Sequence, residues 1–158
     1  DWFRRAGMRN VMLDTHQYLI AMEDQLFSGP ARRLYLRSRR LPWLYRMLVG
    51  ASSIAIRSAA RRIPVLVGEW CVENQWALHS QNRSAAYRQV SRLQRAAWDT
   101  SAGQVYWSYQ LARSAKPGSG EGKPPRDPRN GGNLEAWDLT RVWRHGWIRA
   151  DTSHDDVP

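Results

Sequence analysis

Side chains that can do chemistry follow three apolar segments of this 158-residue sequence. The first segment ends in Asp14 to Tyr18 (DTHQY), the second in Gly68 to Trp70 (GEW) and the third in Tyr106 to Tyr109 (YWSY). A carboxylate can act as a nucleophile or proton carrier, and an imidazole can orient a neighbouring group. The candidate functional residues therefore cluster at the ends of these segments.

The three segments are predicted to be strands. Residues 10–16 (NVMLDTH) and 63–70 (IPVLVGEW) are short apolar runs with a polar end, and residues 104–111 (QVYWSYQL) are rich in aromatic side chains. Short apolar runs of this kind are typical of buried parallel strands. In parallel α/β proteins, catalytic groups lie at the carboxyl ends of the strands, where these polar residues stand.

Alternation along the strands predicts which side chains point the same way. If the extended course continues, Asp14, His16 and Tyr18 share one face of the first strand. In the second strand, Glu69 is expected to share a face with the apolar Val67. A carboxylate in that position would lie at the mouth of a packed interior.

Helical patterns separate the predicted strands. Residues 31–40 and 43–61 are predicted to be helical and divided by a proline, and residues 134–148 form a short aromatic-rich helix or turn. Residues 114–133 are rich in Gly and Pro and are predicted to be a long loop. Strands that alternate with helices favour an α/β fold with a parallel sheet.

The segment from Ser84 to Trp98 has the clearest amphipathic pattern. Ser84 is the predicted N-cap, and Gly103 stands where a C-cap belongs. The residues of its apolar stripe are Tyr87, Val90, Leu93 and Ala97. This stripe is expected to pack against the sheet.

Composition excludes several classes of protein. The single cysteine, Cys71, rules out an internal disulfide and a cysteine-rich zinc site. No apolar run reaches the length of a membrane span, and the N-terminal DWFRR is not a signal peptide. The net charge is +10, but all but two of the 24 basic residues are Arg. This skew indicates a general preference for Arg in the sequence. It favours a solvated basic surface as the interpretation of the charge, and it disfavours a phosphate-binding site.

Nine tryptophans are more informative than the charge, since an exposed indole offers a flat face on which a sugar ring can stack. The motifs LDTHQYLI, VLVGEW, VYWSY and AWDLTRVWRHGWI resemble the C-terminal part of glycoside hydrolase family 5, and most closely its exo-β-1,3-glucanase branch. The resemblance covers about residues 8–148. It implies an α/β fold that is the C-terminal portion, about strands six to eight, of a (β/α)8 TIM barrel. Residues 1–150 would be a partial catalytic domain and residues 151–158 a disordered tail.

The resemblance also implies roles for individual residues. Glu69 would be the catalytic nucleophile, and His16, Tyr18 and Trp107 would bind the substrate. Tyr18 could hold Glu69 ionised, His16 could bind a sugar hydroxyl or orient Glu69, and Trp107 would form the floor of the sugar subsite. The implied activity is retaining hydrolysis of β-glucan or related β-glucosides, with an oligo- or polysaccharide substrate, no metal and no other cofactor.

The sequence departs from the family at two places. In the family, a Glu that follows an Asn at the end of strand four acts as both acid and base, and this sequence contains no Asn-Glu pair. The resemblance therefore implies that the N-terminal half of the barrel is missing and that these residues alone are inactive. Gln110 stands where fungal glucanases tend to have Lys, which leaves a β-1,4-endoglucanase open. The family implies a secreted protein, although residues 1–5 do not have the pattern of a signal peptide.

Each candidate residue also has a structural interpretation. Glu69 could form an ion pair with an Arg, and His16 and Asp14 could make structural hydrogen bonds. Glu73 is a rival carboxylate beyond the strand, and Cys71 is expected to be a buried small residue. Trp70 is expected to pack at the end of its strand.

Two other functions stay open. The chain could be an Arg-rich basic domain that binds nucleic acid or an acidic surface. It could also be a non-catalytic remnant that binds sugar through Trp107.

Overall fold

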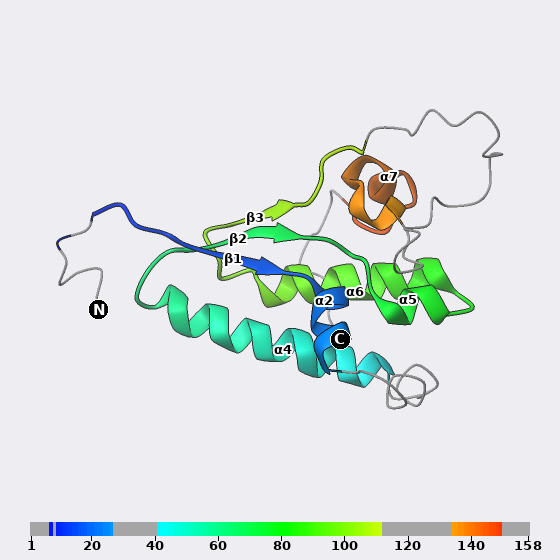
Figure 1. The fold of residues 1–158 in the computed structure, drawn as a ribbon, viewed down its shortest axis with the longest axis horizontal. Helices are drawn as coiled ribbons and strands as arrows, with labels where there is room; N and C mark the ends of the chain where they lie inside the picture. The colour runs from blue at the N-terminus through cyan, green and yellow to red at the C-terminus, as the bar shows by residue number, and fades with distance from the viewer. Residues whose placement is uncertain (1–6, 8, 27–40, 112–133, 150–158) are drawn as a thin grey trace.

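The computed structural model describes residues 7, 9–26, 41–111 and 134–149. Three strands, five α-helices and one 3-10 helix lie within these ranges. In chain order they are β1 (Leu13–Gln17), α2 (Leu19–Leu26), α4 (Leu41–Ala60), β2 (Val65–Trp70), α5 (Gln75–His79), α6 (Arg83–Ala97), β3 (Gly103–Tyr106), η1 (Leu134–Trp137) and α7 (Leu139–Arg144) (Figure 1). The predicted segments 31–40 and 114–133 and the tail 151–158 lie outside the described residues.

The strands form a small parallel sheet in the order β1-β2-β3. The parallel pairing was expected, but the expected portion of a (β/α)8 barrel is wrong. Within the described residues β1 and β3 each pair with β2 alone, so they form the two edges of an open sheet of three strands. A barrel needs a sheet that closes on itself with tilted, staggered strands. The motifs at the strand ends predict where functional residues lie but carry no information about closure.

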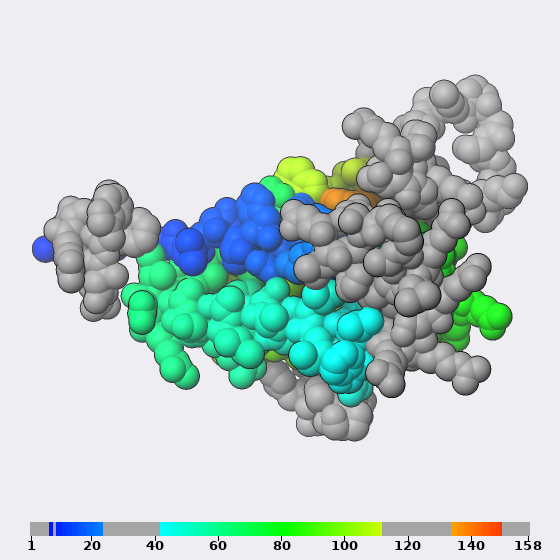
Figure 2. Space-filling view, turned by 60° about the horizontal axis from the view of Figure 1, so that its bottom comes forward, coloured from blue at the N-terminus to red at the C-terminus, as the bar shows by residue number. Residues whose placement is uncertain are grey.

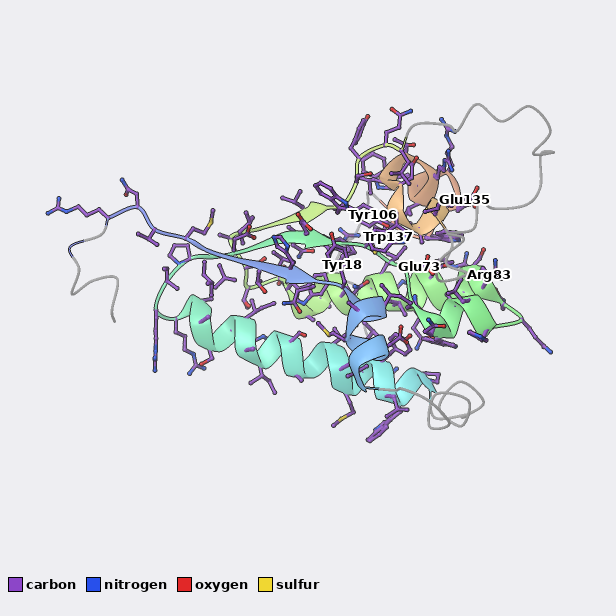
Figure 3. The ribbon with its side chains drawn as sticks, viewed as in Figure 1. Tyr18, Glu73, Arg83, Tyr106, Glu135 and Trp137 are labelled. Carbon is purple, nitrogen blue, oxygen red and sulfur yellow. The ribbon has the colours of Figure 1, made fainter. Side chains whose placement is uncertain are left out.

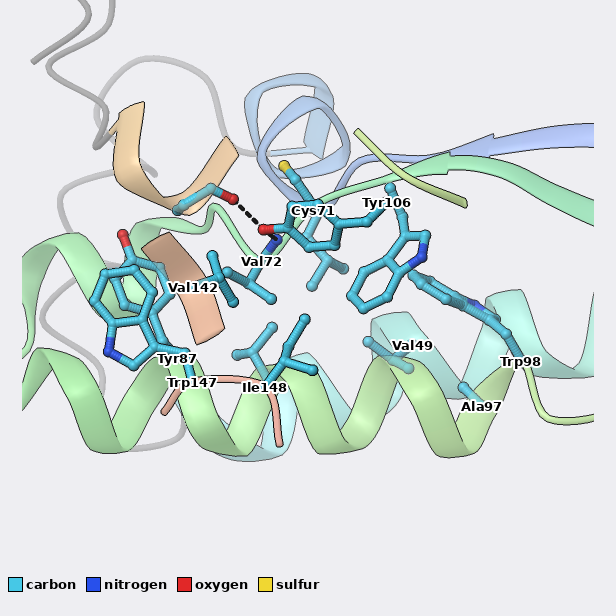
Figure 4. Packing of buried hydrophobic residues seen from close by; sticks show 14 of the residues in the cluster. Val49, Cys71, Val72, Tyr87, Ala97, Trp98, Tyr106, Val142, Trp147 and Ile148 are labelled. Carbon is cyan, nitrogen blue, oxygen red and sulfur yellow. Dashed lines mark hydrogen bonds between the residues drawn. The ribbon is translucent and has the colours of Figure 1, made fainter. Parts of the chain in front are cut away.

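Helices α4 and α6 lie against one face of the sheet (Figure 1). The core between these layers contains Val65 and Val67 of β2, Val49 of α4 and Val90 of α6, all at most 3% exposed. Figure 4 shows how the core continues toward α7, where Val142 and Ile148 meet the aromatic rings of Tyr87 and Trp147. In the space-filling view, α4 forms much of the front surface and β1 runs along its upper border (Figure 2).

The amphipathic helix predicted from Ser84 is confirmed as α6, but its caps differ. Asn82 is the N-cap, and its side chain accepts a hydrogen bond from the Ala85 backbone N–H at 3.0 Å. Ser84 lies inside the first turn and accepts a hydrogen bond from Trp147 Nε1 at 3.1 Å instead. Asn and Ser are about equally good N-caps, so the pattern alone could not separate two candidates two residues apart.

Other boundaries also differ from the prediction. Gly103 does not cap α6, which ends at Ala97 with Trp98 as its C-cap; Gly103 is instead the first residue of β3. Strand β3 ends at Tyr106, which is earlier than predicted. The proline expected to divide two helices lies within the first turn of α4, where a missing backbone N–H costs no helical hydrogen bond. Helix α2 was not predicted at all. In the described part of the chain, no helix is both long and apolar enough to span a bilayer.

Candidate functional site

A bulge in the pairing of β1 with β2 sets the orientation of the candidate nucleophile. Thr15 pairs with Val67, but the next residue of β1, His16, pairs with Glu69, so Gly68 is an extra residue in β2. An inserted residue shifts the alternation of side chains. Glu69 therefore contacts His16 on the open face, and the expectation that it shares a face with the buried Val67 is wrong.

The same bulge returns Trp70 to the helix-covered face. Trp70 is 4% exposed and packs edge-on against Trp98 and Tyr106, with ring centroids 5.3 and 4.9 Å away. The expectation that Trp70 serves packing is confirmed. Consecutive residues of β2 thus have different roles, since Glu69 faces outward and Trp70 anchors the strand end in the core.

Two side chains hold one oxygen of Glu69. Tyr18 Oη donates a hydrogen bond to Glu69 Oε2 at 2.7 Å, and His16 Nδ1 lies 3.3 Å from the same oxygen. Within the described residues, no hydrogen bond or ion pair reaches the other oxygen, Oε1. The Glu69 side chain is 28% exposed. The carboxylate is therefore held through Oε2, whereas Oε1 is not buried and has no partner among the described residues.

Tyr18 is held by stacking as well as by its hydrogen bond. It follows β1 and precedes α2, and its ring stacks on Trp137 of η1 with centroids 5.3 Å apart (Figure 3). Burial, and then the hydrogen bond to Glu69, raise the pKa of Tyr18 well above its ordinary value. The phenol therefore stays protonated and remains a donor to the carboxylate at neutral pH.

His16 lies between two carboxylates. Its Nδ1 faces Glu69, and its Nε2 lies 3.4 Å from Asp14 Oδ2. The imidazole is half exposed, so packing contributes little to holding it. Asp14 and His16 share the open face of β1, as their spacing predicted, whereas Tyr18 lies beyond the end of the strand.

Trp107 continues the third strand at the carboxyl end of the sheet, where Glu69 lies. Its backbone N–H donates to the carbonyl oxygen of Trp70 at 2.8 Å, which extends the pairing of β3 with β2. The preceding Tyr106 is buried, so alternation directs Trp107 to the open face that carries Glu69. The indole is 50% exposed. The four predicted site residues thus lie at the carboxyl end of the sheet. Three of them, His16, Tyr18 and Glu69, are in direct contact.

No protein-family model matches the sequence, and no curated protein matches it. The arrangement of side chains at the carboxyl end of the sheet is therefore the evidence for function.

The two rival residues, Glu73 and Cys71, lie in the interior and not on the open face of the sheet. Glu73 is 1% exposed and accepts a hydrogen bond from the Tyr87 hydroxyl at 3.3 Å. Cys71 is fully buried, as expected, and burial raises the pKa of its thiol well above the ordinary value. Neither side chain is available to a substrate on the open face. Among the described residues, no three His, Cys, Asp or Glu side chains are grouped as metal ligands.

Sequence reasoning missed two features of the site. Trp137 supports Tyr18 from a segment more than a hundred residues away in the chain, and no local pattern indicates that contact. Gly68 makes room for Asp14, since a Cβ on Gly68 would lie 2.0 Å from Asp14 Oδ1. The spacing of Asp14 and His16 was a usable signal for their pairing, whereas the role of Gly68 depends on the bulge.

Proposed function

We propose that this protein is a retaining glycoside hydrolase that acts on β-glucan or related β-glucosides, with Glu69 as its nucleophile. One observation carries the proposal: Tyr18 and His16 both contact Glu69 Oε2, while Oε1 is not buried and has no partner among the described residues. A nucleophilic carboxylate must be ionised, immobile and reachable, and this arrangement favours all three properties.

The proposed reaction has two displacements at the anomeric carbon. In the first, Glu69 Oε1 forms a bond to the anomeric carbon while the bond to the leaving oxygen breaks; that oxygen keeps the electron pair and takes a proton from bulk water, which leaves a hydroxide ion. In the second, water attacks the same carbon, the electron pair of the ester bond returns to Glu69 Oε1, and the proton lost by the attacking water neutralises that hydroxide. The anomeric configuration is inverted twice and so retained.

Tyr18 and His16 support the first displacement from the protein side. The Tyr18 hydroxyl donates to the ionised carboxylate, which stabilises the charge that Glu69 needs in order to attack. His16 fixes the same oxygen from the direction of β1. Both contacts leave the attacking oxygen free, so they hold the carboxylate without blocking the substrate.

Trp107 supplies the proposed sugar-binding surface. Its half-exposed indole lies at the end of β3, the strand next to the one that carries Glu69. The apolar faces of glucose units stack on indole rings, and the indole N–H can donate to a hydroxyl. This supports a β-glucoside, whose equatorial hydroxyls leave flat apolar faces, as the class of substrate.

The test isolates the nucleophile from the proton donor. We assign no described carboxylate to the acid role, so the probe is 2,4-dinitrophenyl 2-deoxy-2-fluoro-β-D-glucoside, whose leaving group departs without a proton. We expect release of one equivalent of dinitrophenolate and a covalent fluoroglucosyl adduct that peptide mapping places on Glu69. The matched variants are Glu69→Gln, which should give no adduct, and Glu135→Gln, which should react like the original protein. Glu135 lies in η1, and its Oε2 is 3.1 Å from His145 Nε2.

Two results would contradict the proposal. One is the absence of any adduct on correctly folded protein after prolonged incubation at millimolar probe. The other is an adduct on Glu73 or Glu135 that persists in the Glu69→Gln variant.

A further inference from the structure

Asp14 stands behind the residues that touch Glu69, and it reaches them because of a glycine. We propose that Asp14 is a positioning residue that sets the orientation of His16 against Glu69, and that Gly68 is required to admit its carboxylate. This inference rests on the proposed nucleophilic role of Glu69. It adds a residue pair, Asp14 and Gly68, that touches neither the substrate nor the attacking oxygen.

Gly68 leaves the space that the Asp14 carboxylate occupies. A Cβ at this position would lie 2.0 Å from Asp14 Oδ1, 2.7 Å from its Cγ and 2.9 Å from Oδ2. All three distances are too short for real contacts, so any side chain at Gly68 would displace the Asp14 carboxylate. The displaced group is the end of a short, exposed side chain, which can swing into solvent without disturbing the backbone.

The backbone conformation at position 68 does not require a glycine. Gly7 and Gly146 have positive φ angles of 70° and 63°, where other residues are strained. Gly68 has no such angle. Its lack of a side chain therefore serves the space that Asp14 occupies, not a turn of the chain.

The His16 ring is restrained at both of its nitrogens. Its two nitrogens face two different carboxylates, Nδ1 toward Glu69 and Nε2 toward Asp14. An imidazole that is contacted at one nitrogen alone can still turn about its Cβ–Cγ bond. Contacts at both nitrogens define one orientation of the ring. Because His16 is half exposed, Asp14 supplies a restraint that packing does not.

A contribution to global stability does not explain the contact. The side chains of His16 and Asp14 are 50% and 57% exposed, and ion pairs this exposed contribute little to folding. Loss of Asp14 should therefore change the reaction of Glu69 more than it changes the stability of the fold.

The experiment uses the variants Asp14→Ala and Gly68→Ala and the combination of both. With the dinitrophenyl fluoroglucoside, each single variant should lower the limiting rate of adduct formation about tenfold and leave the probe affinity nearly unchanged. The double variant should be no slower than Asp14→Ala, because Gly68 acts through Asp14. Asp14→Asn, which keeps an acceptor for His16, should recover part of the rate.

The controls match the substitutions. Gly50 lies in α4, and a Cβ added there would have nothing within 4 Å, so Gly50→Ala adds the same methyl group where no contact exists. Asp99→Ala removes an exposed carboxylate that lies just beyond the end of α6. Both controls should form the adduct at the original rate.

A second readout separates this inference from the proposed function. The imidazole nitrogen and ring-proton NMR signals of His16 should shift in Asp14→Ala and in Gly68→Ala, and they should coincide in the two variants. If the original protein forms no adduct but the His16 signals shift in both variants, the nucleophile assignment is wrong and the positioning of His16 by Asp14 still stands. Original labelling rates in both single variants, or additive losses in the double variant, would overturn the inference.

Discussion

Two carboxylates, Glu69 in β2 and Asp138 before α7, are used in opposite ways. Glu69 of β2 is contacted by Tyr18 and His16 at one oxygen, and its other oxygen is not buried and has no partner among the described residues. Asp138, the N-cap of α7, is 1% exposed and uses both of its oxygens. The difference shows how the same chemical group can be prepared for reaction in one place and for structure in another.

The partners of Asp138 leave it no reactive oxygen. Oδ1 accepts from Thr140 Oγ1 at 2.7 Å and from the Arg141 N–H at 3.1 Å, and Oδ2 accepts from the Leu111 N–H at 3.0 Å. The Arg141 guanidinium also lies 3.3 Å from Oδ2. These contacts join the start of α7 to the segment that follows β3. The comparison predicts that Glu69 governs reactivity and Asp138 governs stability.

The largest expected effect is at Glu69. Glu69→Gln keeps an oxygen for Tyr18 but removes the charged nucleophile, so adduct formation should fall about 10³-fold or more. The free energy of unfolding should change by less than about 1 kcal/mol, because the side chain is partly exposed. Stopped-flow dinitrophenolate release and urea denaturation measure the two quantities. A large loss of stability with unchanged reactivity would reverse the comparison.

The next effect is at Asp138. Asp138→Ala removes an N-cap and leaves buried donors without a partner, which should lower the free energy of unfolding by about 2–3 kcal/mol. Urea denaturation of the two proteins measures it. Asp138→Asn is the matched variant and should cost less, because it retains an oxygen for the helix N-terminus. Equal stability of the alanine variant and the original protein would contradict a structural role.

The pH dependence of stability gives a second test of the structural role of Asp138. Burial acts to raise the pKa of Asp138, but hydrogen bonds from Thr140, Leu111 and Arg141 and the Arg141 charge outweigh it, and the pKa lies below its ordinary value. A carboxyl with a lowered pKa in the folded state stabilises the fold above its unfolded pKa of about 4, and this stabilisation is lost as the pH falls through the folded pKa. The difference between the original protein and Asp138→Asn should therefore be full at pH 6 and shrink below pH 4.

A smaller effect is expected at Tyr18. Tyr18→Phe keeps the ring on Trp137 but removes the hydroxyl that donates to Glu69, so adduct formation should slow by about tenfold. A raised Tyr pKa stabilises the fold fully below the unfolded pKa of about 10, and this contribution is lost as the pH rises toward the folded value. Above pH 10 the variant should consequently lose stability less steeply than the original protein. Parallel alkaline curves would place the raised pKa elsewhere.

The sequence predicted the placement of the candidate residues better than it predicted the architecture. Asp14, His16, Glu69 and Trp107 could be assigned to strand ends, because apolar runs that turn polar are a local signal. The bulge at Gly68 was not predictable, since a single extra residue is visible only in the pairing of two strands. That bulge decides the face on which Glu69 lies.

Sheet closure lies still further from the sequence signal. Motif order predicted parallel strands, but whether such strands close into a barrel depends on which edges find partners. In the described residues β1 and β3 remain edges, and α2 begins directly after Tyr18 where continued extension was expected. Long-range contacts of this kind, like that of Tyr18 with Trp137, are set by packing between distant segments.

The smallest predicted effect tests a local signal that was ambiguous. Asn82 Oδ1 accepts from the Ala85 N–H at the start of α6, so Asn82→Ala should lower the free energy of unfolding by about 1 kcal/mol. Ser84→Ala loses only the bond from Trp147 Nε1 and should cost about half as much, because the helix keeps its cap. Urea denaturation of both variants ranks the two residues. A larger loss in Ser84→Ala would show that anchoring Trp147 matters more than capping the helix, and neither variant should alter the reactivity of Glu69, which lies on the opposite face of the sheet from α6.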